Sequence, residues 1–68
     1  MRGQFDIFKG TTGGQPLWVE AISGLEAAIS RMQELALQKP GRYFVYSTDS
    51  AKVVATTDPL TGDTVRND

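Results

Sequence analysis

A chain of 68 residues with a net charge of −1 can form one small domain, and it lacks the positive excess that a nucleic-acid-binding surface requires. It contains no cysteine and no histidine, which excludes disulfides, thiolate metal sites and the commonest catalytic base. No apolar run is long enough to span a bilayer, and no apolar signal segment follows Met1. We therefore expect a cytoplasmic protein with no cofactor, no metal and no membrane partner.

The first third of the chain predicts two strands joined by a glycine-rich loop. Gln4–Lys9 and Pro16–Ile22 each carry apolar residues on both alternating positions, and Gly10–Pro16 has the glycines and proline of a turn. Pro16 cannot donate a hydrogen bond to a neighbouring strand, which places the second strand at a sheet edge. The loop lacks the lysine and the following helix of a phosphate-binding loop, so we interpret it as a hairpin connection.

A helix follows the second strand. Ser23 and Glu26 have the spacing of a capping box, in which each side chain accepts a hydrogen bond from the other residue's backbone N–H. The helix is expected to reach Gln38, where Pro40-Gly41 ends it. One apolar stripe of helical period predicts the buried face: Leu25, Ala28, Ile29, Met32, Leu35 and Ala36.

Two further strands are predicted at Arg42–Thr48 and Ala51–Thr57, separated by turn residues. The order β-β-α-β-β indicates a two-layer α+β domain, with one helix on one face of a four-stranded antiparallel sheet. A right-handed crossover predicts the strand order 2-1-3-4. The domain is then residues 1–57, and residues 58–68 form a polar, flexible tail.

The third strand raises a question, because its residues are apolar on both faces. We expect Phe44 to face the helix, since it has no polar atom that needs a partner, and Tyr43 and Val45 to point away. Phe8 and Trp18 would lie beside them on the far face. An apolar patch of this kind marks an association surface. We therefore predict interface residues Phe8, Trp18, Tyr43 and Val45. The opposite register would place Phe44 and Tyr46 outside instead.

These residues favour a non-enzymatic protein-interaction module, a homodimer or a binder of another protein, that uses the open sheet face or an edge strand. A single-stranded nucleic-acid binder that stacks bases on the same aromatics is the alternative, and the acidic net charge disfavours it. The tail, with Leu60 and Val65, is another candidate to cover the face. Asp6 and Glu20 could meet on the far face and form an acid–base pair, but solvated strand charges are the simpler interpretation.

Three stretches together resemble a group of small bacterial proteins of similar length. They are "FDIF", "PLWVEAISGLEAAISRMQELA" and "PGRYFVYS", which fall between residues 4 and 48. The group shares a W-V-E segment, a capped helix and a P-G-x-Y-F-V strand. The resemblance implies a bacterial, cytoplasmic setting. It brings no activity and no site residues.

Overall fold

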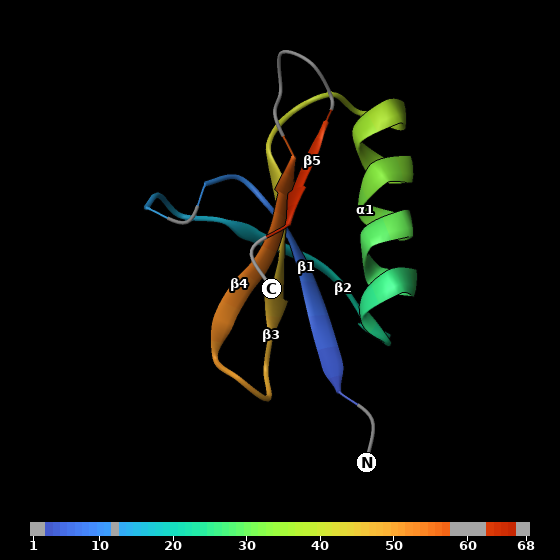
Figure 1. Cartoon of the computed structure of the whole chain (residues 1–68). Helices are drawn as coiled ribbons and strands as arrows, with labels where there is room; N and C mark the ends of the chain where they lie inside the picture. Colours follow the sequence, from blue (N-terminus) through green and yellow to red (C-terminus); the bar gives the residue numbers. More distant parts are fainter. Residues whose placement is uncertain (1–2, 12, 58–62, 67–68) are drawn as a thin grey trace.

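The computed structural model describes residues 3–11, 13–57 and 63–66, and it has two layers (Figure 1). The helix α1 (Leu25–Gln38) lies along one face of an antiparallel sheet, and the tip of the β1–β2 hairpin leans out on the other side. The strands of the sheet are β1 (Gln4–Lys9), β2 (Leu17–Ser23), β3 (Tyr43–Ser47), β4 (Lys52–Thr57) and β5 (Thr64–Arg66).

The sheet has five strands in the order β2-β1-β3-β4-β5, so the predicted order of the first four is confirmed and their number is corrected. The fifth strand comes from the segment that was expected to be a tail. Thr64 pairs with Thr57, and Arg66 pairs with Ala55. Three residues are too few for an alternating pattern to stand out in the sequence. Residues 58–62 and 67–68, including Leu60, lie outside the described residues.

One row of side chains crosses all five strands beneath the helix. In register order it is Glu20, Ile7, Val45, Ala55 and Arg66, and the three central members are fully buried. Residues directly opposite one another on antiparallel strands share a face, so the row forms a continuous floor for α1. Ala28, Ile29 and Met32 complete the core from the helix side. Burial of this apolar surface is the main stabilising contribution in a domain of this size.

Both ends of this row are charged, and α1 pairs with each of them. Arg31 Nε lies 2.9 Å from Glu20 Oε2 on one edge strand, and Arg66 Nη1 lies 3.1 Å from Glu26 Oε2 on the other. Partly exposed pairs of this kind contribute at most about 1 kcal/mol each. The two pairs lie on the two edge strands, so α1 contacts both margins of the sheet.

The predicted orientation of β3 is wrong. Tyr43 and Val45 are 3 % and 0 % exposed in the core beneath the helix, and Phe44 points to the opposite face. The argument from polar atoms failed because the hydroxyl of Tyr43 does find a partner. It donates to the carbonyl oxygen of Lys39 at 2.7 Å, just beyond the end of α1. The ammonium of Lys9 lies 5.9 Å from the centroid of the same ring, a cation–π contact.

A bulge in β2 changes which of its residues face the helix. The register between β1 and β2 shifts between Ile7 and Phe8, which leaves Val19 as an extra residue opposite them. An extra residue reverses the alternation beyond it. Glu20 therefore lies on the helix side, where Val19 also packs against the core, and Ala21 points away. Our expectation that Glu20 lies on the far face is corrected.

The start of α1 is not a capping box. Ser23 is the last residue of β2 and pairs with Gln4, so its backbone belongs to the sheet. Gly24 is the N-cap instead, with φ +93° and no side-chain cap bond, and its N–H donates to the carbonyl oxygen of Gly3 at 3.3 Å. A single residue thus turns the chain from strand to helix, in a conformation that glycine adopts without steric cost.

Replacement of the central helix residue tests the core. Met32→Ala should lower the free energy of unfolding by about 2–5 kcal/mol, because Met32 is fully buried over the floor of the sheet. Leu37→Ala is the control on the same helix: Leu37 is 85 % exposed, and its removal should change stability by no more than about 0.5 kcal/mol. Urea unfolding measures both. Equal losses would contradict the assigned helix face.

A second pair of variants tests the helix start. Gly24→Ala should cost about 1–2 kcal/mol, because the alanine must adopt a positive φ. Ser23→Ala should stay within about 0.5 kcal/mol, since its hydroxyl makes no cap bond. The opposite ranking in urea unfolding would support the capping box.

Candidate functional site

The face of the sheet away from α1, called here the open face, carries its own row of side chains. In register order it is Trp18, Phe8, Phe44, Thr56 and Val65, one from each strand. The bulge in β2 and a second register shift between Val45 and Tyr46 lie beside this row. The row therefore joins three aromatic side chains from β2, β1 and β3 on one surface.

Aromatic contacts close the middle of the open face. The rings of Phe8 and Phe44 stack with their centroids 5.1 Å apart and an interplanar angle of 11°. Tyr46 meets Phe8 edge-on at 6.5 Å and 88°. Phe44 is only 5 % exposed, and Phe8 and Tyr46 are half-buried. The second apolar face of β3 is therefore covered largely within the chain, which answers the question that its sequence raises.

Of the four exposed large apolar side chains among the described residues, two adjacent ones lie at the β2 edge; the others are Leu37 on α1 and Val65 on β5. Leu17 is 69 % exposed and Trp18 is 60 % exposed, at the start of a seven-residue strand whose outer side pairs with no strand of the described chain. Adjacent residues on a strand point to opposite faces, so Leu17 and Trp18 flank the edge from both sides. Pro16 precedes the first residue of the strand and leaves the backbone donors of β2 intact.

The predicted interface residues are therefore divided between two surfaces. Phe8 and Trp18 lie on the open face, where the sequence places them. Tyr43 and Val45 lie in the core on the helix side and are not accessible to a partner. In the sequence, the adjacent Leu17 and Trp18 on a predicted edge strand indicate the exposed site. No sequence pattern indicates the bulge that follows them.

Asp6 and Glu20 do not meet, so the possible acid–base pair does not form. Asp6 lies on the open face between Ala21 and Tyr46, whereas Glu20 lies on the helix side and binds Arg31. Arg31 donates to Glu20 at 2.9 Å and to Glu34 at 3.1 Å, and these hydrogen bonds, the one to Glu20 first, raise the pKa of Arg31. Arg31 therefore stays charged, and Glu20 has a structural partner rather than a catalytic one.

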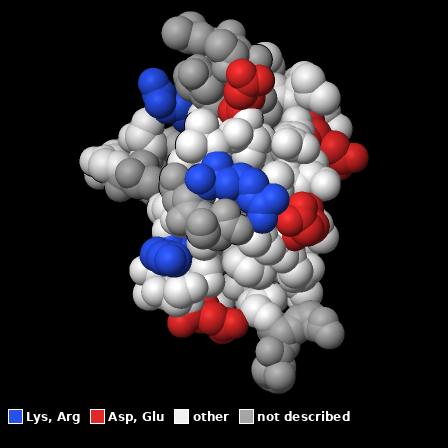
Figure 2. All heavy atoms as spheres, in the orientation of Figure 1, with Lys and Arg blue, Asp and Glu red and all other residues white. Residues whose placement is uncertain are grey.

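The described part of the chain contains no group of three or more His, Cys, Asp or Glu side chains that could hold a metal. Among the same residues, no helix is long and apolar enough to cross a membrane. Figure 2 shows Lys and Arg interspersed with Asp and Glu on the visible face, with neither sign dominant. Comparisons with protein families, curated proteins and solved structures found no match.

Loss of the aromatic stack should weaken the fold moderately. Phe8→Leu should destabilise the protein by about 0.5–1.5 kcal/mol, because it removes the ring contacts with Phe44 and Tyr46. Trp18→Leu, on the same row but exposed, should change the stability of the monomer, measured at low micromolar concentration, by no more than about 0.5 kcal/mol. Urea unfolding again measures both changes. A larger loss for Trp18→Leu would show that the edge, not the stack, stabilises this face.

Proposed function

We propose that this protein is a small interaction module that associates with a second copy of itself by antiparallel pairing of the two β2 edges. The observation that carries the proposal is the exposure of Leu17 and Trp18 on a long edge strand. Long apolar edges with free backbone donors and acceptors are sites of strand pairing. In this protein the backbone would supply hydrogen bonds, and the two side chains would supply buried area.

The other edge of the sheet is much less suited to pairing. β5 has three residues, and its side chains already contact α1: Gln33 donates to the hydroxyl of Thr64 at 2.9 Å, and Arg66 pairs with Glu26. Short edges with charged residues discourage addition of a strand. One edge of the sheet is therefore blunted and one is open, as expected when only one is used for association.

A second copy of the chain suits the β2 edge, because two identical strands can pair antiparallel about a two-fold axis without a partner of different sequence. Leu17 and Trp18 flank each edge, so apolar anchors would lie on both faces of the joined sheet. The one charged residue of the strand, Glu20, is already paired with Arg31, which reduces like-charge repulsion between the copies. The middle of the open face presents less exposed apolar area to a partner, because its aromatic side chains are largely covered.

Base stacking on the open face has weaker support than strand pairing. A nucleic-acid platform presents several exposed rings beside cationic groups. Here Phe44 is 5 % exposed, and Trp18 is the one aromatic side chain of the described residues that is largely exposed. The single-stranded nucleic-acid hypothesis therefore ranks second.

Sedimentation velocity tests the proposal directly. The unmodified protein should sediment as a dimer at high micromolar concentration. Trp18→Lys should shift it to the monomer, because it places a cation on the pairing edge and removes an aromatic anchor. Leu37→Lys is the matched control: it makes the same kind of change at a still more exposed apolar residue, on α1, and it should leave the dimer intact.

A monomer at every concentration of the unmodified protein would contradict self-association. A dimer that both lysine variants disrupt equally, or that neither disrupts, would place the interface elsewhere. Protection of the β2 amides from hydrogen exchange in the dimer, compared with the Trp18→Lys monomer, would distinguish strand pairing from contact through side chains alone.

A further inference from the structure

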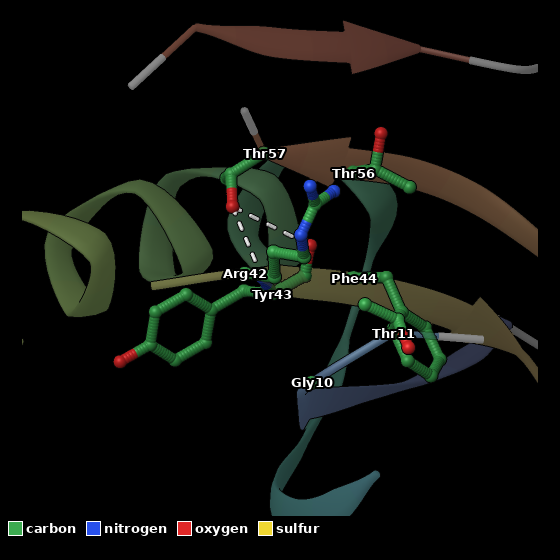
Figure 3. A pocket seen from close by; sticks show the side chains of 7 residues that line it. All are labelled: Gly10, Thr11, Arg42, Tyr43, Phe44, Thr56 and Thr57. Atoms are coloured by element: carbon green, nitrogen blue, oxygen red, sulfur yellow. Dashed lines mark hydrogen bonds between the residues drawn. The ribbon is translucent and has the colours of Figure 1, made fainter. Parts of the chain in front are cut away.

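A hollow of about 160 Å³ lies at the end of the open face, between the β1–β2 loop and the last residues of β4 (Figure 3). Phe44 borders it from β3, Thr56 from β4, Arg42 from the residue before β3, and Gly10 and Thr11 from the loop. A site needs only about 10–15 Å³ of such space to hold one water, so this hollow can admit a small polyatomic group.

The loop is fixed beside the start of β3 by a backbone hydrogen bond. The N–H of Gly10 donates to the carbonyl oxygen of Arg42 at 2.8 Å. Gly10 has φ +124°, and a Cβ there would lie 3.2 Å from the Cα of Pro16. A glycine is therefore needed for the loop to turn here. The bond holds the loop beside the backbone of Arg42, although the two segments are far apart in sequence.

The guanidinium of Arg42 differs from those of the other two described arginines. Unlike Arg31 and Arg66, it forms no ion pair or side-chain hydrogen bond with any residue in the described ranges. In Figure 3 its side chain extends from the residue before β3 toward β4, on the side where Thr56 and Thr57 lie. A guanidinium offers a planar fork of donors that matches carboxylate and phosphate oxygens.

Two threonines also line the hollow, Thr56 on β4 and Thr11 on the loop. Thr56 is half-buried, and neither its hydroxyl nor that of Thr11 hydrogen-bonds to another described residue. Thr57 differs, because its hydroxyl accepts the N–H of Tyr43 at 3.0 Å and serves the fold. The hollow thus combines one unpaired cation with two neutral donors.

The charged side chains near this end of the sheet are of both signs. The ammonium of Lys9 lies 5.9 Å from the centroid of the Tyr43 ring, on the helix side of the sheet. Asp63 precedes Thr64, which pairs with Thr57. Of the described residues that line the hollow, Arg42 is the one that carries a charge.

From this arrangement we infer that the hollow is a binding site for an oxyanion, the phosphate or carboxylate group of a small ligand. Arg42 binds the charge, and the hydroxyls of Thr11 and Thr56 donate to the remaining oxygens. The inference does not depend on self-association, because none of the three side chains belongs to β2. The sequence hides the site, since the loop has no phosphate-loop motif and Arg42 is remote from it.

Titration with inorganic phosphate, and separately with acetate, tests the site by ¹H–¹⁵N NMR at low ionic strength. Phosphate should shift the amides of Gly10, Thr11, Arg42 and Thr56 saturably, with a dissociation constant in the millimolar range. Arg42→Gln should weaken binding by about tenfold or more, because it removes a charge-assisted hydrogen bond. Lys52→Gln, which makes the same charge change at the opposite end of β4, is the matched control and should retain binding.

The two arms identify the ligand class. Saturation by phosphate alone assigns a phosphate site, and saturation by both anions assigns a general oxyanion site that takes carboxylates. No saturation with either anion would overturn the inference, as would equal weakening by Arg42→Gln and Lys52→Gln. Trp18→Lys should leave anion binding unchanged, and Arg42→Gln should leave sedimentation unchanged, so failure of one proposal is distinguishable from failure of the other.

Discussion

The row of side chains that runs from Glu20 through Ile7, Val45 and Ala55 to Arg66 is the feature on which the rest of the structure depends. Its apolar middle gives α1 a surface to cover, and its charged ends bind α1 at both margins of the sheet. A single helix is enough for one face only. The other features of the domain concern what covers the remaining face of the sheet and what lies at its two edges.

Aromatic side chains of the sheet itself, rather than a second helix, cover the middle of the open face. Phe8 lies between Phe44 and Tyr46 and contacts both rings, so these three side chains shield one another and much of β3. The bulge at Val19 follows Trp18, the end member of the same row, at the sheet edge. Apolar surface is thereby closed at the centre of the sheet and left open at β2, which is why association is assigned to the edge.

Much of this architecture could be predicted from the sequence, because the helix stripe follows a simple period and the strand order follows from a right-handed crossover. The helix end at Gln38 and the order of the first four strands are confirmed. The orientation of β3 could not be predicted, because Tyr43 and Phe44 are both aromatic and a period of two does not choose between them. The face on which Glu20 lies depends on a bulge, and the proposed anion site depends on the contact between the Gly10 loop and the backbone of Arg42. Neither feature leaves a local pattern in the sequence.

Gly24 affects whether β2 can separate from the sheet independently of α1. It is the single residue between β2 and α1, and the ion pair between Glu20 and Arg31 joins the same two elements further along. The edge strand therefore cannot peel away from the sheet without straining the first turn of the helix. Strand and helix form one cooperative unit, so an edge whose outer backbone faces solvent keeps its shape before any partner arrives. Such preorganisation reduces the entropy that association must remove.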